Sequence, residues 1–203
     1  MHLLALNRLP TDLHSAIALR ELAVGQILFR QGDSASAFFI VESGRLKVAR
    51  YAPEGRSVTL QIARSGDSFA ESALFSDFYV YTAIAEVASR VIVYPKQPLL
   101  TALREHSNLA EDFMTRLVSK NLFLIMQLEL RDVRAAHRRV LQYLHYLASP
   151  DDANIVSFDR PLKEIAIDLG LTPATLSRAL ARLEREGRIT REQNVVKLNS
   201  SAA

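Results

Sequence analysis

The chain of 203 residues contains no cysteine, and this absence excludes several kinds of chemistry. Without thiols there can be no disulfide, no thiolate metal site, no cysteine-held iron–sulfur cluster and no thiol redox switch. The chain also lacks an apolar run of the roughly 20 residues that a membrane-spanning helix needs. Its N-terminus has no basic segment followed by an apolar one, the pattern of a secretory signal. We therefore expect a soluble, cytoplasmic protein with no membrane partner.

Positive and negative side chains balance over most of the chain. Residues 1–130 contain 13 Lys and Arg against 13 Asp and Glu, whereas residues 131–203 contain 12 against 9, so the net surplus of +3 lies at the C-terminal end. Such a surplus is typical of a surface that faces phosphates, although a solvated charged face fits it equally well when it is judged alone. It gathers around Arg178, Arg182, Arg185, Arg188 and Arg191.

The most informative stretch is LKEIAIDLGLTPATLSRALARLEREGRI, residues 162–189, which predicts two helices joined by a tight turn. Gly170 ends the first helix, because glycine tolerates the left-handed conformation. Thr172 caps the second helix with its hydroxyl, and Pro173 occupies the first helical position, where no amide donor is needed. The apolar residues recur at helical spacing and form one buried face on each helix. They are Leu162, Ile165, Ala166 and Leu169, then Leu176, Leu180 and Leu183.

This pattern is that of a helix-turn-helix with a basic second helix, which can lie in the major groove of DNA. Arg178 is the best candidate for reading a base, since a guanidinium matches the two acceptors of guanine. Ser177 could read a second base through a hydrogen bond. A purely structural helical hairpin with a solvated charged face is the alternative.

The N-terminal half predicts a β-rich domain after a helical lead-in over residues 1–20. From residue 21 to residue 95, short apolar runs alternate with glycine turns, which favours an antiparallel β-sandwich or jelly roll. No helix here is long enough for a βαβ unit, so a parallel nucleotide-binding sheet is not expected. The predicted strands centre on residues 27–29, 38–41, 46–48, 58–62, 82–87 and 91–94.

A brief helical connector over 98–106 leads to a long helix over 108–131, which would span roughly 35 Å. The middle of this helix is apolar nearly all round, so one side can pack on the β domain while the other needs a second partner. Self-association as in a two-stranded coiled coil is the simplest solution, and burial within a monomer is the alternative. The candidate interface residues are Phe113, Leu117, Leu124 and Leu128.

The C-terminal part predicts a winged helix-turn-helix. We therefore expect an α+β protein in three parts: a β-roll sensor-like domain over 1–107, a dimerisation helix and hinge over 108–136, and a DNA-binding domain over 137–203. Around the two central helices we expect a hinge at 132–136, a helix containing 140–147, a turn at 150–154, a strand at 155–158, and a hairpin of 189–191 with 195–198 as the wing.

This order of parts resembles the Crp/Fnr family of bacterial transcription regulators, over essentially the whole chain. The resemblance implies a homodimer that binds a pseudo-palindromic operator in double-stranded DNA and recruits or blocks RNA polymerase. It also implies that a small molecule or cofactor in the roll orients the DNA-binding domains through the long helix. The segments that carry it are LAVGQILFRQGD (22–33), FFIVESGRLKV (38–48), GDSFAESALF (66–75) and IAIDLGLTPATLSRALARLEREGRI (165–189).

The family's phosphate cassette for cyclic AMP has Gly-Glu followed, ten residues beyond the Glu, by Arg-Ser. Here Ala70 and Glu71 stand at the first pair, and Tyr81 and Thr82 at the second. Glu71 retains the carboxylate for a ribose hydroxyl, but Tyr81 replaces the cation that a buried phosphate needs. Ala70 in place of glycine hinders a close backbone approach.

The family also contacts adenine with a Thr-Ser pair on the long helix, and this pair is absent. No Ser or Thr stands between Lys120 and Arg131, where Leu128 and Glu129 fall near the corresponding places. We therefore predict that cyclic AMP binds weakly or not at all.

Other effectors of the family find little support. The oxygen-sensing branch needs cysteines, and the five histidines, at positions 2, 14, 106, 137 and 145, show no pairing pattern for haem. We predict no cofactor and no metal. An unknown apolar ligand near Phe75, Tyr79 and Tyr81 stays open, as does a roll that is only a dimerisation scaffold.

On the recognition helix, the family often reads bases with an Arg, a Glu and a second Arg. Here these places hold Pro173, Ala174 and Arg178, so the guanine contact is retained and the cytosine contact of the Glu is lost. The candidates for gripping phosphates, which fix register rather than sequence, are Lys163, Thr172, Thr175 and Arg182.

The leading hypothesis is a dimeric, sequence-specific transcription regulator. A ligand-binding module whose helical tail contacts a protein is the alternative. An enzyme is not expected, because Glu71 is the single candidate functional carboxylate and no nucleophile–base pair or metal cluster accompanies it in the sequence.

Overall fold

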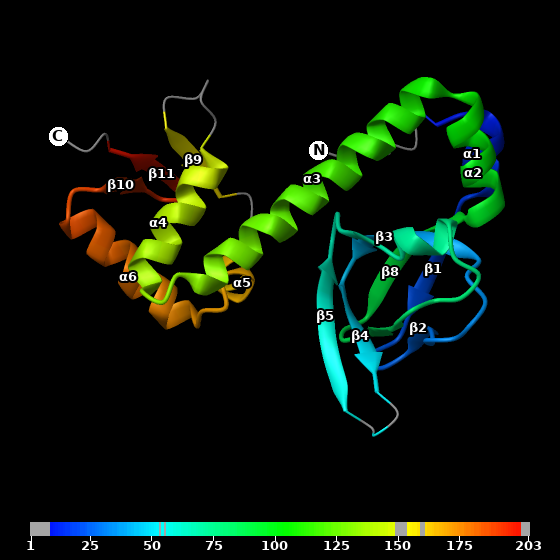
Figure 1. Ribbon diagram of the computed structural model, residues 1–203, viewed down its shortest axis with the longest axis horizontal. Helices are drawn as coiled ribbons and strands as arrows, with labels where there is room; N and C mark the ends of the chain where they lie inside the picture. Colours follow the sequence, from blue (N-terminus) through cyan, green and yellow to red (C-terminus); the bar gives the residue numbers. More distant parts are fainter. Residues whose placement is uncertain (1–8, 53, 55, 149–153, 159–160, 200–203) are drawn as a thin grey trace. The chain divides into compact units, whose positions relative to one another are not determined.

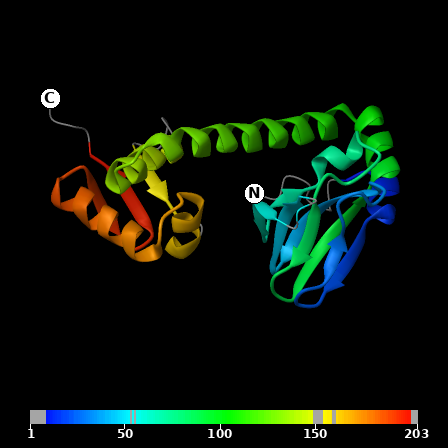
Figure 2. The same cartoon turned by 60° about the horizontal axis from the view of Figure 1, so that its bottom comes forward.

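In the computed structural model the chain folds as two compact units, residues 1–116 and residues 117–203. The structure describes residues 9–52, 54, 56–148, 154–158 and 161–199. The boundary lies inside helix α3 (Ser107–Asp132), which Figure 2 shows as one unbroken helix. Each unit has its own hydrophobic core, so the two halves of α3 belong to different units, whereas the sequence treats residues 108–136 as a separate part.

The first unit is an antiparallel β-roll of two four-stranded sheets, as predicted. One sheet has the order β1 (Ala18–Leu22), β8 (Ser89–Pro95), β3 (Ala37–Ser43) and β6 (Ser68–Phe69). The other has the order β2 (Ile27–Phe29), β7 (Thr82–Ala85), β4 (Arg45–Tyr51) and β5 (Ser57–Arg64). Strands β4 and β5 run side by side as a long hairpin (Figure 1).

Aromatic rings fill the space between the two sheets. The Phe29 ring stacks on Tyr79 with centroids 3.8 Å apart and on Phe39 at 5.4 Å, and Phe39 stacks on Phe69 at 5.3 Å. Tyr81 packs against the same cluster from one side. Because these side chains come from both sheets, they hold the sheets together through apolar burial.

Helices cover the outer side of the first sheet. They are α1 (Thr11–Ala16), α2 (Lys96–Glu105) and the first turns of α3, while the short 3-10 helix η2 (Glu71–Leu74) follows β6. Phe38 and Tyr94 are fully buried on this side of the sheet, and Phe113 meets the Phe38 ring edge-on at 5.7 Å. The ring of Phe113, one of the predicted interface residues, is thus buried against the sheet of its own chain.

The N-terminal segment also differs from the prediction. The apolar spacing predicts a helical lead-in over 1–20, but only Thr11–Ala16 is helical, and Ala18–Leu22 forms strand β1 against β8. Four of the five β1 residues are exposed, so the strand carries no alternating apolar pattern that would reveal it. Residues 1–8 lie outside the described residues.

The second unit is a winged helix-turn-helix, as predicted. Its elements after α3 are α4 (Ala136–Leu147), β9 (Ile155–Ser157), α5 (Leu162–Asp168), α6 (Pro173–Arg185), β10 (Ile189–Glu192) and β11 (Val195–Leu198). The wing is a three-stranded sheet in the order β10-β11-β9, beside α4 and α6 (Figure 1). The predicted turn at 150–154 falls largely outside the described residues. The expected hinge is reduced to residues 133–135, between α3 and α4.

One core joins all parts of this unit. Its members include Met126 and Leu130 from the second half of α3 and Val140 and Leu144 from α4. They pack with helix-turn-helix residues that include Ile165, Leu176, Leu180 and Leu183. The end of α3 is therefore an integral part of the domain that carries α6.

Candidate nucleic-acid interface and effector pocket

Three local features form the turn between α5 and α6: a glycine with a positive φ, a side-chain cap and a proline. Gly170 has a φ of +63°, and the amide of Leu171 donates to the carbonyl of Ala166 at 2.8 Å, which ends α5. Thr172 then accepts a hydrogen bond from the amide of Thr175 at 3.2 Å, and Pro173 follows at the first helical position. These are the interactions that the sequence predicts.

Helix α6 buries one face and exposes the other. Leu176, Ala179, Leu180 and Leu183 are buried in the core of the unit. The residues predicted to read bases are all exposed on the remaining surface of the helix, and they are Pro173, Ala174, Ser177 and Arg178.

A row of polar contacts runs along the first two turns of α6. The Thr172 and Thr175 hydroxyl oxygens are 2.8 Å apart and share a hydrogen bond, and Arg178 Nη2 donates to Thr175 Oγ1 at 3.3 Å. The guanidinium of Arg178 is thus linked to the capped end of its helix. This restricts its rotamers before any ligand arrives.

The predicted phosphate contacts differ in their surroundings. Lys163 is exposed on α5, whereas Thr172 and Thr175 are engaged in the cap. Arg182 pairs with Glu186 one turn further, with Nε and Oε1 2.6 Å apart, and this hydrogen bond lowers the pKa of the Glu186 carboxyl. Both side chains are exposed, so a phosphate can compete with this pair at little cost.

The wing adds further polar groups beside α6. The side chain of Asn199 donates to the carbonyl of Gly187 at 2.9 Å and to the Thr190 hydroxyl at 3.2 Å, which fixes the base of the hairpin. Arg188 and Lys197 are exposed on this hairpin.

Helix α3 presents an apolar face in the second unit. Phe123, Met126 and Leu130 turn into the core, while Leu117 is half-buried. The predicted interface residues Leu124 and Leu128 are 48% and 60% exposed. Val118, Leu122 and Ile125, which are exposed on the same stretch, extend the apolar surface.

Three of the four predicted pocket residues lie together in the roll. Ala70 is buried with a φ of +65°, and its amide donates to the Tyr81 hydroxyl at 2.8 Å. Glu71 accepts from the Ser68 hydroxyl at 2.7 Å. Thr82 is turned elsewhere, because its hydroxyl oxygen accepts the amide of Gln31 at 2.9 Å.

The electrostatics of this cluster keep Tyr81 neutral. Burial, followed by the nearby charge of Glu71, raises the pKa of the Tyr81 phenol to about 12. A cation does reach the neighbouring turn: Arg116 of α3 donates to the Ser68 hydroxyl at 3.1 Å and to the Gly66 carbonyl at 2.8 Å. The carboxylate of Glu71 and the guanidinium of Arg116 thus share Ser68 as a partner.

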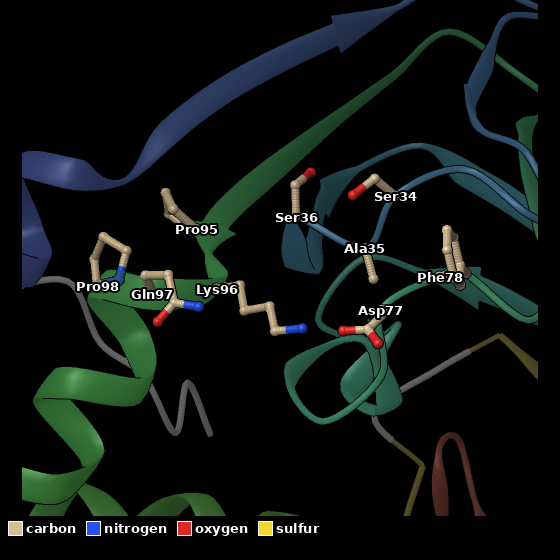
Figure 3. Close-up of a pocket in the computed structure, with 9 residues that line it drawn as sticks. All are labelled: Ser34, Ala35, Ser36, Asp77, Phe78, Pro95, Lys96, Gln97 and Pro98. Carbon is tan, nitrogen blue, oxygen red and sulfur yellow. The ribbon is translucent and has the colours of Figure 1, made fainter.

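Two cavities of the roll lie away from this cluster. The first, of about 440 Å³, lies between the loop before β3 and the start of α2, and Figure 3 shows Lys96 and Asp77 pointing into it. Lys96 Nζ donates to the carbonyl of Ser76 at 2.7 Å. The second, of about 430 Å³, is lined by Thr82 together with Gln31 and Tyr51. Neither cavity is lined by Ala70, Glu71 or Tyr81.

The described part of the chain holds neither a candidate metal site nor a candidate membrane span. It contains no group of three His, Asp or Glu side chains that could hold a metal ion. It also contains no helix that is both long and apolar enough to cross a membrane.

A contact between Arg139 and two backbone carbonyls was not foreseen from the sequence. Arg139 Nε and Nη2 both donate to the carbonyl of Val133, at 3.0 and 2.8 Å, and Nη1 donates to the carbonyl of Leu169 at 2.9 Å. In the sequence, Arg139 is one more arginine of the basic C-terminal part. Its acceptors are backbone carbonyls, which every residue has, so the contact cannot be predicted from residue types.

Comparison with known proteins identifies both units. Residues 19–106 match the family model of the cyclic nucleotide-binding domain, and residues 138–202 match that of the Crp-like helix-turn-helix domain.

Several relatives match over most of this chain. A probable transcriptional activator of Rhizobium leguminosarum bv. viciae is 30% identical over 178 residues, which cover 83% of this chain and 71% of the relative. The transcriptional regulator LdrP of Thermus thermophilus is 27% identical over 189 residues, covering 91% and 94%. The crystal structure of DNR from Pseudomonas aeruginosa matches with a TM-score of 0.53 and 29% identity, covering 94% and 86%.

Proposed function

Since the chain belongs to the Crp/Fnr family of transcription regulators and carries a helix-turn-helix DNA-binding domain, we propose that it acts as a homodimer on a pseudo-palindromic operator. The observation that carries this proposal is the exposed polar surface of α6, in which Arg178 is already linked to the capped helix end. Arg178 would read a guanine and Ser177 a second base, while Pro173 and Ala174 contact base edges by shape. Lys163, Thr172, Thr175 and Arg182 would grip phosphates.

The proposed dimer forms through the second half of α3. The exposed apolar side chains there, led by Leu124 and Leu128, would lose their contact with water against the same face of a second copy. A two-fold dimer places two copies of α6 on successive turns of DNA, which matches a palindromic site. The cytoplasm is the expected location, since the DNA lies there.

A substitution on this face tests the dimer. Leu128→Asp should shift the chain from dimer to monomer, because it places a charge in the apolar interface. Val24→Asp is the matched control, since Val24 is an equally exposed apolar residue of the roll, 69% against 60%. Sedimentation of the two variants at equal concentration gives the readout, and a Leu128→Asp dimer as tight as the control would contradict this interface.

We further propose that cyclic AMP binds weakly or not at all. In the cassette the amide of Ala70 is already used by Tyr81, and a neutral phenol stands where a phosphate would need a fixed cation. Calorimetric titration of the purified protein with cyclic AMP should give no binding heat. Saturable binding in the micromolar range would contradict this part of the proposal. An effector of another kind, and the recruitment or blocking of RNA polymerase, follow from the family alone.

Selection of bound sequences from a random DNA duplex pool tests the main proposal. Purified protein without added effector should enrich a palindromic motif whose half-sites lie about one helical turn apart. Enrichment only after addition of cell extract would show that an effector sets the active arrangement. No enrichment in either case, from folded and dimeric protein, would favour a ligand-binding module whose helical tail contacts a protein.

A further inference from the structure

The guanidinium of Arg139 joins two segments that lie 36 residues apart in the chain. One is the short link after α3, where the carbonyl of Val133 accepts two hydrogen bonds at 2.8 and 3.0 Å. The other is the end of α5, where the carbonyl of Leu169 accepts one at 2.9 Å. Both acceptors and Arg139 itself belong to the second unit.

This contact uses the chemistry that distinguishes arginine from lysine. A planar guanidinium can serve several acceptors at once in fixed directions, whereas an ammonium acts as a point charge. The carbonyl of Leu169 lies at the C-terminal end of α5, where the helix dipole favours a cation. Arg139 is partly buried, so its hydrogen bonds are less exposed to competition from water than those of a surface side chain.

The joined segments lie at the end of α3 and at the start of the turn that leads into α6. Val133 directly follows the end of α3, and Leu169 directly precedes Gly170, the turn that leads into α6. The core contacts of Met126 and Leu130 with α4 residues and the hydrogen bond between Tyr146 and Glu129 also tie α3 to this unit. Arg139 adds to these contacts a hydrogen bond to the carbonyl directly before Gly170 in the turn of the helix-turn-helix.

We propose that Arg139 is a positioning residue which holds the recognition helix at a fixed orientation to the dimer helix and thereby sets the half-site spacing that the protein accepts. This inference rests on the proposed function, because spacing has a meaning only for a dimer on paired half-sites. One added base pair moves a half-site by roughly 3.4 Å and turns it by roughly 35°. A domain held by this contact as well as by the shared core follows this displacement less readily than a domain held by the core alone.

The test compares Arg139→Gln with Arg138→Gln in the full-length protein. Arg138 is the exposed neighbour on the same helix, so the control removes the same charge without touching the clamp. Binding is measured to the selected operator and to duplexes in which the spacer is one base pair longer or shorter. We expect wild type and Arg138→Gln to lose about tenfold or more in affinity on either altered spacer, and Arg139→Gln to lose about threefold or less.

A readout of spacing separates positioning from a merely structural role. If Arg139 only stabilises the fold, Arg139→Gln lowers the melting temperature and weakens all three duplexes by the same factor, which would overturn the inference. Should Arg139→Gln not fold, Arg139→Lys replaces it, because lysine keeps the charge but cannot serve both carbonyls. We expect relaxed spacing from this variant too, and wild-type spacing from it would overturn the role of the guanidinium.

The two levels of the proposal fail differently. A wild-type protein that binds no paired half-sites would overturn the proposed function and this inference with it. A wild-type protein that binds them, with Arg139→Gln following Arg138→Gln on every spacer, would overturn the inference alone.

Discussion

The cassette of the roll and the start of the recognition helix use their polar groups in opposite ways. At the cassette the amide of Ala70 donates to the hydroxyl of Tyr81 in the same unit, and Tyr81 packs against the cluster of aromatic rings. At α6 the cap is satisfied by Thr172, and the side chains beyond it remain exposed. The first region is therefore closed by its own residues, and the second is open toward a ligand.

This difference indicates how a domain of the cyclic nucleotide-binding family can keep its fold while the residues of its cassette change. A buried backbone donor must have an acceptor, and either a bound phosphate or a phenol hydroxyl can supply one. With Tyr81 in that role the amide of Ala70 has its acceptor without a bound ligand. The polar row on α6 is linked by hydrogen bonds of its own, but its side chains are largely exposed, so a ligand can still reach them.

The largest expected loss of unfolding free energy comes from replacing a glycine by alanine, and it should differ between the roll and the helix-turn-helix. In the closed roll, Gly44 has a φ of +90°, and a Cβ there would lie 2.6 Å from the carbonyl oxygen of Ala88 and from the Cα of Ser89. Gly44→Ala should therefore cost about 3 kcal/mol or more through overpacking and a left-handed backbone. At Gly170 the nearest atom is 3.8 Å away, so Gly170→Ala should cost only about 1–2 kcal/mol from its left-handed backbone.

Urea unfolding of both alanine variants measures this difference. The two substitutions share the same change and a positive φ, so each controls for the backbone cost in the other. Equal losses of unfolding free energy would show that the roll is no more tightly packed at this point than the helix-turn-helix turn.

The next effect concerns binding at the open region. Arg178→Ala should cost about 1–3 kcal/mol on the selected operator and relax discrimination at one base pair, since it removes the proposed guanine contact.

Lys163→Ala should weaken binding to all sequences alike and reduce the slope of affinity against salt concentration, because it removes a proposed phosphate contact. Titrations on specific and scrambled duplexes at several salt concentrations give both quantities. A sequence-selective loss from Lys163→Ala would reverse the assigned roles.

Local signals explain why the helix-turn-helix can be predicted from the sequence. The end of α5 and the start of α6 depend on Gly170, Thr172 and Pro173, and each of these acts on backbone groups within a few residues of itself. The long helix is equally predictable, because an apolar repeat without Pro or Gly extends from one end to the other. The β-roll follows from the spacing of its glycine turns.

Features that depend on tertiary partners are missed. The helical repeat cannot tell which apolar residues of α3 are buried within the chain itself, and Phe113, a predicted interface residue, is one of them. Tyr81 lies just before β7 and reaches the cassette, whereas Thr82, the first residue of β7, turns to Gln31. The contact of Arg139 with a carbonyl 30 residues away has no local signal at all.

A smaller difference in stability is expected between the residues that begin η2 and α6, Ala70 and Thr172. Tyr81→Phe should cost about 1–3 kcal/mol of unfolding free energy, because it leaves the amide of the buried Ala70 without its acceptor. Thr172→Ala removes the acceptor of an exposed amide, which water can replace, and should cost about 1 kcal/mol. Chemical denaturation of both variants gives the comparison. A larger loss from Thr172→Ala would mean that the cassette is accessible to water.

The smallest effect at neutral pH is expected at Tyr94, a second buried tyrosine of the roll. Its hydroxyl has no hydrogen-bond partner among the residues that the structure describes, and burial raises the pKa of its phenol to about 12. Tyr94→Phe should therefore change the unfolding free energy by less than about 1 kcal/mol at pH 7, in the stabilising direction, because it removes a buried polar group that gains nothing. This contrasts with Tyr81, whose hydroxyl is bonded.

Alkaline pH should enlarge the effect of Tyr94→Phe with a definite sign. The unfolded phenol ionises near pH 10, whereas the folded one remains neutral up to about pH 12, so the wild type loses stability as the pH rises through this window. At pH 11 the difference between the two pKa values corresponds to about 1 kcal/mol from this one group. Tyr94→Phe should accordingly be more stable than the wild type by about that amount at pH 11. The measurement is the unfolding free energy of both proteins at pH 7 and at pH 11. If the difference between them does not change, Tyr94 ionises as readily in the folded roll as in the unfolded chain, and water reaches this side of the roll.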